Sequence, residues 1–590
     1  QEERIPQWCI DRLFEIGVMG MTIPEEYGGL GLGVTSYNRV LERIGAACGS
    51  TSVVVSAHQS IGCKALMLFG TDEQKKEYLP KVAREYLSAF CLSEPNVGCD
   101  AGGQETTIEL SEDGTHYIVN GEKKWSTSGA LSGMFTVMGK QWIEHPKTGK
   151  KKQAVTAVIV TPDMEGVDIF QKNRSKCGIR GTWQARIRFT NVKVPVANRL
   201  HKEGKGLNVA LTCLNYGRCT LSSGILGAAK KARDQATKWA RTRYQFNRPL
   251  SDFDLVQEKI ARMAAYTYAI DAMLYMMTGM LDRHDSDIMV ETAAAKVFAS
   301  EMGWQVIDDA MQIMGGEGYM TENELERAFR DARIYRIVEG ANEVMWSFVF
   351  AYGGKQLAEQ MLGVQTAMFY DTDENPFENI GRMVTNALNP AIMSRAIPLG
   401  LQLVLRIKPK KPVISGYHPD LRPFADRLAK LVRDHSHWFK LASMKNKEHI
   451  VTRQTIQARI SDTAIHLFAM SAVLSKLSAQ LRAGVRGTEF LRDQAAALHF
   501  FEMAELTINE NIRALNKNAD RSMREAAKAA IDHTDTLSDG KFYISERSPV
   551  SAGNGRATEQ QHIKQFPGGS QLEMGDGRST DAEVEVKPRA

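Results

Sequence analysis

The sequence has few cysteines, and none of them stands in a metal-binding or disulfide pattern. All eight lie before residue 220, at positions 9, 48, 63, 91, 99, 177, 213 and 219, and no two form a CxxC pair. Scattered thiols of this kind indicate neither a zinc site nor a disulfide framework. We therefore expect reduced cysteines, no bound metal and a reducing compartment.

Other common signatures are absent as well. The sequence has no GxGxxG, no Walker loop, no HExxH and no GxSxG, so a dinucleotide cofactor would have to bind without a Rossmann fingerprint. Neither sign of charge is in large excess: 74 basic and 69 acidic residues give a net charge of +5, so we expect no nucleic-acid partner. No apolar run reaches the roughly 18 residues of a membrane span, and no signal peptide is visible.

What the sequence does contain is enough apolar material for a large core, with 43% hydrophobic and 24% charged residues. Its 590 residues suggest about four domains. His116 to Val119 alternates in hydropathy before the tight-turn pair Asn120-Gly121, whereas the flanking regions show helical spacing. We predict an α+β, mainly α fold with an N-terminal helical domain at 1–88, a β domain at 89–200, a helical bundle at 201–362, an extra C-terminal helical domain at 363–538 and a disordered or extended tail at 539–590.

Four short segments give local predictions. Thr71-Asp72-Glu73-Gln74 predicts a helix N-terminus, and HPKTGKKKQ at 145–153 predicts a solvated hairpin loop. QIMGGEGYM, from Gln312 to Met320, predicts a glycine-rich loop between helices. Asp371 to Pro376 predicts a turn inside a break of the helical pattern at 363–380.

Three further segments contain candidate chemistry. RDARIYRIVEGANE, from Arg330 to Glu343, sets Glu339 directly before Gly340, although a lone glutamate is more often a helix cap or a surface ion-pair partner. FCLSEPNVGCD, starting at Phe90, contains a turn whose N–H groups can face an acceptor-rich ligand. KWSTSG, starting at Lys124, offers an indole that can cover an aromatic ring system.

Together these segments resemble those of the acyl-CoA dehydrogenases. PEEYGG, AHQSIG and FGTDEQKKEYLP near the N-terminus, LNYGR at 214–218 and RTRYQFN at 241–247 are also similar to the family. The resemblance covers nearly all of 1–362 and continues more weakly through 363–535, where the very-long-chain subgroup carries an extra helical domain. The family's first helix begins earlier than Gln1, so we expect the N-terminal domain to be incomplete.

The resemblance implies a catalytic base, Glu339, and sites for FAD and acyl-CoA. The residues implied to contact FAD are Cys91, Leu92, Ser93, Gly98, Cys99, Asp100, Trp125, Ser126, Thr127, Arg243, Phe246, Gln312, Gly315, Gly316, Ala341, Asn342 and Glu343. Those implied to contact the substrate are Cys99, Asn215, Tyr216, Gly217, Arg218, Val338 and Gly340. In the family, the arginine, phenylalanine and glycines matched by Arg243, Phe246, Gly315 and Gly316 serve the FAD of a neighbouring subunit.

Several positions depart from the family pattern. Cys99 stands where a serine contacts the substrate, which leaves a weaker hydrogen-bonding group, and Ala341 stands where a threonine hydroxyl is common. The other departures are Ser93 in place of Thr, Ser126 in place of Ile, and Tyr244 and Asn247 in RTRYQFN.

The implied function is α,β-dehydrogenation of long- or very-long-chain acyl-CoA to trans-2-enoyl-CoA in fatty acid β-oxidation. Electrons would pass to electron-transferring flavoprotein, and the enzyme would be a homodimer. Two alternatives are an acyl-CoA oxidase of the same fold and an assembly scaffold for a respiratory complex. The implied location is the mitochondrial matrix, peripheral on the inner membrane, or the cytoplasm or cytoplasmic membrane face in a bacterium.

Two segments bear on substrate length and on membrane contact. Ser50 to Ala65 resembles the helix beside the acyl tunnel of the very-long-chain subgroup, with Gly62 kept small and Ala65 in place of a glycine. AIPLGLQLVLRIKPKKP, at 396–412, sets a short apolar stretch before four cations and predicts a segment that lies in a membrane interface. The alternative is a helix packed on the bundle with a solvated basic end.

Overall fold

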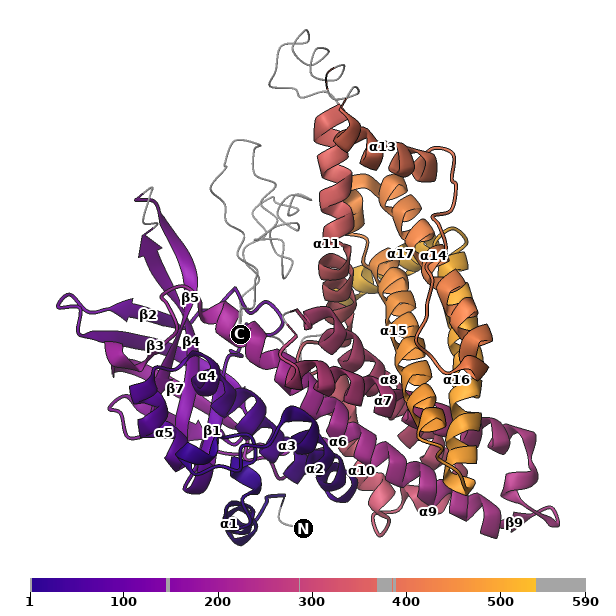
Figure 1. The fold of residues 1–590 in the computed structure, drawn as a ribbon. Coiled ribbons are helices and arrows are strands. Elements are labelled where there is room, and N and C mark those ends of the chain that lie inside the picture. Colours follow the sequence, from indigo (N-terminus) through magenta and orange to yellow (C-terminus); the bar gives the residue numbers. More distant parts are fainter. Residues whose placement is uncertain (1–2, 145–148, 286, 369–384, 386–388, 537–590) are drawn as a thin grey trace.

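The computed structural model describes residues 3–144, 149–285, 287–368, 385 and 389–536. In Figure 1 a β domain with the N-terminal helices lies at one side, and the long helices of the C-terminal half lie at the other. The predicted tail at 539–590 and the predicted turn at 371–376 lie outside the described residues.

The N-terminal region is helical, as predicted. Its helices are α1 (Gln7–Glu15), α2 (Val34–Ala47), α3 (Gly49–Ser56), α4 (Cys63–Phe69) and α5 (Asp72–Arg84), with a π-helical segment at Ala57–Gly62 and 3-10 turns at Val18–Gly20 and Glu25–Tyr27. α5 begins at the predicted position because Thr71 accepts a hydrogen bond from the Gln74 N–H at 3.3 Å, and the Gln74 side chain accepts one from the Thr71 N–H at 2.9 Å. This reciprocal pair is a capping box.

The middle region is a mixed eight-stranded sheet in the order β6-β7-β3-β2-β4-β5-β8, with β1 paired in parallel to β4. The strands are β1 (Leu87–Cys91), β2 (Thr107–Leu110), β3 (His116–Ser126), β4 (Ser132–Glu144), β5 (Lys151–Val160), β6 (Val167–Gln171), β7 (Ala185–Pro195) and β8 (Arg199–Leu200). Side chains that alternate along β4 contribute to two separate cores. Met134 and Met138 pack with residues of α4, α5 and the helix α6 (Gly206–Thr242), whereas Phe135 and Val137 pack with Ile187 of β7.

Long helices build the bundle. They are α6 (Gly206–Thr242), α7 (Asp254–Asp282), α8 (Met289–Met314), α10 (Glu324–Ala332) and α11 (Asn342–Met368), with a short α9 (Gly316–Tyr319) and a hairpin of β9 (Tyr244–Gln245) and β10 (Arg248–Pro249). Glycines let α2 cross α6 closely: a Cβ built on Gly45 would lie 2.4 Å from the Gly224 carbonyl oxygen. The N-terminal region is therefore packed directly on the helix that carries Gly217 and Arg218.

The remaining helices extend the bundle and share its core. They are α13 (Pro390–Leu403), α14 (Arg422–Asn446), α15 (Gln454–Arg482), α16 (Thr488–Ala514) and α17 (Asp520–His533). Phe298 of α8 meets Phe500 of α16 edge-to-face with ring centroids 5.7 Å apart. Lys476 of α15 donates at 2.5 Å to Asp271 of α7. The predicted extra helical region is thus joined to the bundle by both apolar and charged contacts.

The structure corrects three local expectations. Residues 312–320 are not a loop, because α8 runs to Met314, α9 begins at Gly316, and Gly315 alone breaks the helix with a φ of 60°. α11 continues to Met368, past the expected domain end at 362. Gly62 is small because it packs on β1: a Cβ there would lie 2.3 Å from Ser88 Oγ, so its size gives no measure of an acyl tunnel.

The expectation about membrane-length stretches also needs correction. Within the described residues, Gly49–Phe69 and Gln454–Arg482 are long and apolar enough, by length and composition, to cross a membrane. In the most apolar windows of these helices, 67% and 56% of the residues are buried inside the fold. Both therefore serve here as core helices.

Candidate active site

The Arg330–Glu343 segment is held by other parts of the chain before it reaches Glu339. The buried Asp331 carboxylate accepts a 2.5 Å hydrogen bond from the Ile179 N–H. Arg327, one turn earlier on α10, donates at 3.0 Å to the Ala47 carbonyl at the end of α2. These bonds explain why the charged part of RDARIYR lies against the N-terminal and β domains.

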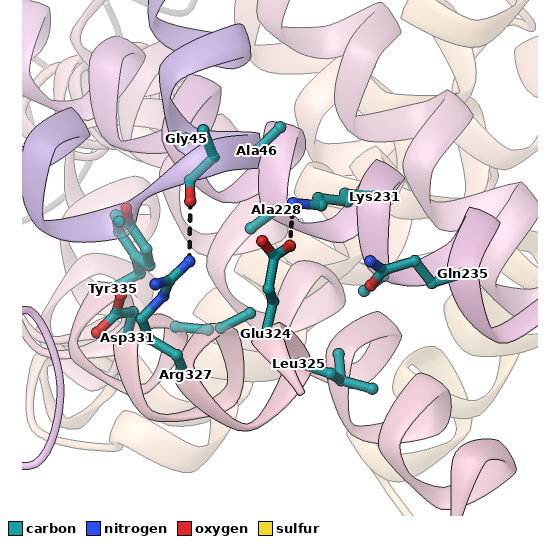
Figure 2. Close-up of a pocket in the computed structure, with 16 residues that line it drawn as sticks. Gly45, Ala46, Ala228, Lys231, Gln235, Glu324, Leu325, Arg327, Asp331 and Tyr335 are labelled. Carbon is teal, nitrogen blue, oxygen red and sulfur yellow. Dashed lines mark hydrogen bonds and ion pairs between the residues drawn. The ribbon is translucent and has the colours of Figure 1, made fainter. Parts of the chain in front are cut away.

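Figure 2 shows a crevice at this junction, between α2, α6 and α10, where Lys231 and Glu324 meet in an ion pair. Its volume of about 30 Å³ is close to that of one water molecule, and Glu339 does not line it. The crevice is a packing gap between helices and is too small for an acyl-CoA.

The backbone turns sharply at Glu339 and Gly340, directly before α11. Their φ angles are 58° and 92°, a region that non-glycine residues rarely adopt and that is common at functional sites. The φ of Gly340 favours glycine, because a residue with a side chain would be strained in this conformation. The flanking Val338 and Glu343 are exposed. Within the described part of the chain the Glu339 N–H donates no hydrogen bond, which leaves it available to a ligand.

The turn places the Glu339 carboxylate on α6 at Gly217. A Cβ on Gly217 would lie 2.7 Å from Oε1 and 2.8 Å from Oε2, so the missing side chain provides the space for the carboxylate. Arg218, the next residue, is buried. Glu339 Oε2 and Arg218 Nε are both buried without a hydrogen-bond partner among the described residues. Because such atoms are costly to leave unpaired, they indicate a site that a polar ligand completes.

Burial also changes the proton affinity of this carboxylate. It raises the pKa of Glu339 to about 7, against the lowering effect of Arg218 and Lys296. Burial lowers the pKa of Arg218 to about 10. A carboxylate whose pKa lies near neutral pH is well matched to general-base work at that pH.

The predicted substrate residues on α6 lie around the same arginine. Arg218 Nη1 donates to Asn215 Oδ1 at 3.2 Å, and Thr292 of α8 donates to the same oxygen at 3.0 Å. The guanidinium lies 5.1 Å from the ring centroid of Phe348 on α11. Tyr216 is partly buried. The structure therefore brings Asn215 to Arg218 together with Glu339.

Sequence reasoning missed Thr292 and Phe348, and also Lys296 of α8, which contacts the turn itself. Its side chain is buried, and Nζ donates to the Gly340 carbonyl at 2.7 Å and to Asn342 Oδ1 at 2.6 Å. The available signal was a lone lysine inside AAAKVFAS, a run of otherwise small and apolar residues. A lysine at a core position of a helix indicates a buried polar partner.

The loop after β1 approaches the turn from the β domain. The Ala341 N–H lies 3.5 Å from Cys99 Sγ, a contact between the two segments. Gly98, Cys99 and Asp100 are exposed, and a Cβ on Gly98 would meet nothing within 4 Å. The backbone of this loop is therefore open to a ligand beside the Glu339 turn.

A buried ion pair fixes that loop to β3. Lys123 Nζ donates to Glu94 Oε1 at 2.6 Å and to Gln104 Oε1 at 2.5 Å, and the two charged side chains are at most 1% exposed. Lys123 also donates to the carbonyl of the predicted FAD residue Leu92 at 3.3 Å. The pair sets the loop geometry rather than contacting a ligand itself.

Trp125 is presented to solvent at the end of β3. Its side chain is 48% exposed and its φ is 66°. Ser126 Oγ donates to the buried Cys91 Sγ at 3.4 Å, and the Ser93 carbonyl accepts from the Lys124 N–H at 2.8 Å. These bonds join β3 to the loop after β1, so the predicted FAD residues of the β domain form one surface.

That surface fits the flavin of an FAD. An exposed indole, the partly exposed Thr127 and the open backbone at Gly98 lie on segments that adjoin the Glu339 turn. A flat aromatic side chain and unshielded backbone groups suit a large planar ligand with polar edges.

Ala341, Asn342 and Glu343 directly follow the Glu339 turn. The other five predicted FAD residues, Arg243, Phe246, Gln312, Gly315 and Gly316, lie in another part of the molecule. Figure 1 shows β9 and α9 at the end of the bundle away from the β domain. Phe246 is 88% exposed, Arg243 and Gln312 are exposed, and a Cβ on Gly315 or Gly316 would meet nothing within 4 Å. One chain does not bring these residues to Glu339.

Comparison with known protein families gives a consistent result along the chain. Residues 1–86, 89–192 and 204–352 match the N-terminal, middle and C-terminal domains of acyl-CoA dehydrogenases. Residues 419–536 match the domain described as "ACAD9/ACADV, C-terminal domain". Thus the extra helices after α11 also have a counterpart among known proteins.

Individual relatives agree. The mitochondrial very long-chain specific acyl-CoA dehydrogenase of Rattus norvegicus is 34% identical over 538 residues, which cover 90% of this chain and 79% of the relative. The crystal structure of an acyl-CoA dehydrogenase complexed with FAD from Bacillus anthracis has a TM-score of 0.70 and 28% identity, with 96% of this chain and 89% of that chain covered. Butyryl-CoA dehydrogenase from Megasphaera elsdenii has a TM-score of 0.56 and 32% identity, with coverage of 60% and 91%. The chain belongs to the acyl-CoA dehydrogenase family.

Proposed function

We propose that this protein is an FAD-dependent dehydrogenase that converts long- or very-long-chain acyl-CoA to trans-2-enoyl-CoA in fatty acid β-oxidation. The observation that carries the proposal is the Glu339 carboxylate, which lies on Gly217 with Oε2 unpaired and has a pKa of about 7. This is the form of carboxylate that can remove a proton from the carbon next to a thioester carbonyl.

Residues of the chain provide each part of the proton transfer. Glu339 accepts the α-proton, and the positive charge of Arg218 favours its ionised form against the effect of burial. The Glu339 N–H, which is free within the described residues, donates to the thioester oxygen where negative charge develops. Asn215 and Thr292 hold Arg218 in place through their shared hydrogen bonds.

When bound, FAD supplies the acceptor for the hydride that leaves the β-carbon. We assign Trp125, Thr127 and the loop from Cys91 to Asp100 to the flavin ring, because they form the open surface beside the Glu339 turn. The buried Lys123–Glu94 pair keeps that loop in one arrangement.

The same proposal includes a homodimer in which a second copy completes each FAD site. Arg243 suits a pyrophosphate through its fixed fork of donors. Phe246 lies in the hairpin that follows Arg243, and in a single chain 88% of its surface is exposed. Leu255, at the start of α7, and Tyr319, at the end of α9, are 74% and 73% exposed and add further apolar surface. An exposed apolar patch of this kind is typical of a protein interface.

The electron acceptor in this proposal is electron-transferring flavoprotein, which the family relationship favours. An acyl-CoA oxidase of the same fold would instead give its electrons to oxygen. The rate of flavin reoxidation after the reduced protein is mixed with air-saturated buffer distinguishes the two functions. Slow reoxidation supports the dehydrogenase, and complete reoxidation within one turnover supports the oxidase.

Substrate length is tested by kcat/KM across acyl-CoAs from butyryl to very long chains. We expect kcat/KM to rise toward palmitoyl-CoA and beyond, because 419–536 matches the extra domain and the most similar curated relatives include very-long-chain enzymes. A preference for butyryl-CoA over palmitoyl-CoA would contradict this assignment.

We further propose peripheral membrane contact through residues 396–412, with the mitochondrial inner membrane as the site in a mitochondrial protein and the cytoplasmic membrane face in a bacterial one. In this segment Val404 is 77% exposed, Leu405 63% and Ile407 50%. Lys408 and Lys411 form ion pairs with Asp434 and Asp426 of α14 at 3.0 Å. An apolar surface flanked by cations suits the boundary between headgroups and acyl chains.

A further inference from the structure

The Glu339 turn is attached to α8 on both of its sides. After the turn, Lys296 Nζ donates to the Gly340 carbonyl at 2.7 Å and to Asn342 Oδ1 at 2.6 Å. Before the turn, Arg336 Nε donates to Glu301 Oε1 at 2.9 Å. One helix therefore holds the chain three residues before Glu339, at Arg336, and one and three residues after it, at Gly340 and Asn342.

The two attachments meet at one side chain. Asn342 Nδ2 donates to Glu301 Oε1 at 2.7 Å and to Ser300 Oγ at 2.9 Å, while its Oδ1 accepts from Lys296. Lys296, Ser300 and Asn342 are nearly or fully buried. A fully satisfied buried network of this kind favours one geometry over its alternatives.

We propose that Lys296 is a positioning residue for the Glu339 base: through the Gly340 carbonyl and Asn342 it holds the Glu339 turn so that the carboxylate lies on Gly217. The inference rests on the proposed role of Glu339. The left-handed backbone at a non-glycine residue is unfavourable by itself and persists only where surrounding contacts determine it. Lys296 supplies such contacts at the residue that follows the base, and so acts on its position without touching the substrate.

Lys296 also contributes charge to the site. The titratable groups that face the Glu339 carboxylate and Lys296 are Arg218 and Cys213 of α6, Glu301 of α8 and Cys99 of the loop after β1. Against the raising effect of burial, Arg218 and Lys296 both lower the pKa of Glu339. Burial also lowers the pKa of Lys296 to about 7, so its charge acts on Glu339 mainly on the acid side of neutral pH. Because the acid limb of the rate profile lies on that side, loss of the Lys296 cation raises the pKa of Glu339 and moves this limb to higher pH.

Two variants separate the hydrogen bonds from the charge. Lys296→Met removes both, whereas Lys296→Gln removes the charge but keeps an N–H donor on a side chain that is one bond shorter. Lys230→Met is the control. Lys230, like Lys296, donates to two partners inside the fold, but its partners are Glu42 and Asp271, it is only partly buried, and it belongs to the contacts between α2, α6 and α7. Each purified holoenzyme is assayed for bound FAD, melting temperature, flavin reduction by palmitoyl-CoA from pH 5.5 to 9, and hydrogen exchange of the peptide 333–345.

We expect Lys296→Met to reduce flavin about ten- to a hundredfold more slowly per bound FAD, because a displaced catalytic group loses this much rate, with a change in KM of less than about threefold. Lys296→Gln should recover part of the rate, and both variants should show the same shift of the acid limb. Exchange of the 333–345 peptide should become faster in Lys296→Met. Lys230→Met should lower the melting temperature and leave the rate per FAD, its pH profile and that peptide unchanged.

The inference is overturned if Lys296→Met or Lys296→Gln lowers only the melting temperature and retains the rate per FAD and its pH profile. If Lys296→Met yields no holoenzyme, Lys296→Gln decides by the same two readouts. Glu339→Gln is measured alongside. If Glu339→Gln is inactive while the Lys296 variants are normal, only this inference fails; if Glu339→Gln is active, the proposed base fails and the inference fails with it.

Discussion

The Glu339 carboxylate lies directly on the Cα of Gly217, one residue before the buried Arg218. Any side chain at 217 would occupy the position of the carboxylate, since a Cβ there would be 2.7 Å from Oε1. The absence of a side chain at Gly217 therefore gives the Glu339 carboxylate its space against α6. This relationship gives the first prediction.

Gly217→Ala should lower the rate of flavin reduction about ten- to a hundredfold, because the new methyl group displaces the carboxylate, while FAD content stays near normal. Gly279→Ala is the control: it adds a methyl group to a glycine of α7 where the Cβ would lie 3.9 Å from Arg283 Nη1, an ordinary van der Waals contact. Equal rates for Gly217→Ala and Gly279→Ala would show that the carboxylate does not act from its position on Gly217.

The buried Lys123–Glu94 pair gives a prediction about stability and cofactor retention. Lys123→Met leaves the Glu94 carboxylate buried without its cation, which should reduce the free energy of unfolding by about 3 kcal/mol and loosen the loop that we assign to FAD. Thermal unfolding and the ratio of flavin to protein absorbance after gel filtration measure both effects. An unchanged ratio of flavin to protein absorbance would show that this ion pair does not contribute to cofactor binding.

The shared FAD site predicts that cofactor and assembly depend on each other. Arg243→Ala should weaken FAD retention and shift sedimentation toward the monomer, because the exposed hairpin after α6 is proposed to reach the FAD of a second copy. Exposed Arg283 of α7, which lies outside the predicted site, provides the control variant Arg283→Ala. Normal flavin content and normal sedimentation of Arg243→Ala would refute the shared site.

The membrane proposal is tested with point variants, because deletion of 396–412 would also remove part of α13. Leu405→Asp should reduce flotation with cardiolipin-containing vesicles, and raised salt should weaken binding of the unaltered protein. Leu506→Asp, on the α16 surface, is a matched control, since Leu506 is 72% exposed and Leu405 63%. Equal flotation of both variants and the unaltered protein would exclude this segment as the anchor.

The sequence predicted the parts of the site that are contiguous in the chain. Glu339 with Gly340, and the pair of segments around Cys99 and Trp125, could be proposed from the sequence because their residues follow one another in short motifs, and their roles stay predictions. Lys296 was missed because its partners, Gly340 and Asn342, lie far from it in the sequence and come together only when α8 packs beside the turn.

Local patterns also failed where packing overrides the usual behaviour of a residue. The two glycines of QIMGG predicted a loop, yet the helix breaks only at Gly315 and resumes at Gly316. Gly62 was noted as a small residue in a segment that resembles the helix beside the acyl tunnel, and the structure adds a separate reason for its size, since a Cβ there would lie 2.3 Å from Ser88 Oγ of β1. In both cases the deciding factor is a backbone conformation or a close approach, which hydrophobic periodicity does not report.

The most direct test of the central claim is the anaerobic rate of flavin reduction by palmitoyl-CoA, measured by stopped flow from pH 5.5 to 9 in the unaltered protein and in Glu339→Gln. Because only the ionised carboxylate accepts a proton, the rate of the unaltered protein should rise with pH and be half-maximal near the Glu339 pKa of about 7. Glu339→Gln should bind FAD normally and react at least about a hundredfold more slowly throughout. Reduction of Glu339→Gln at a near-normal rate would contradict the assignment of Glu339 as the base.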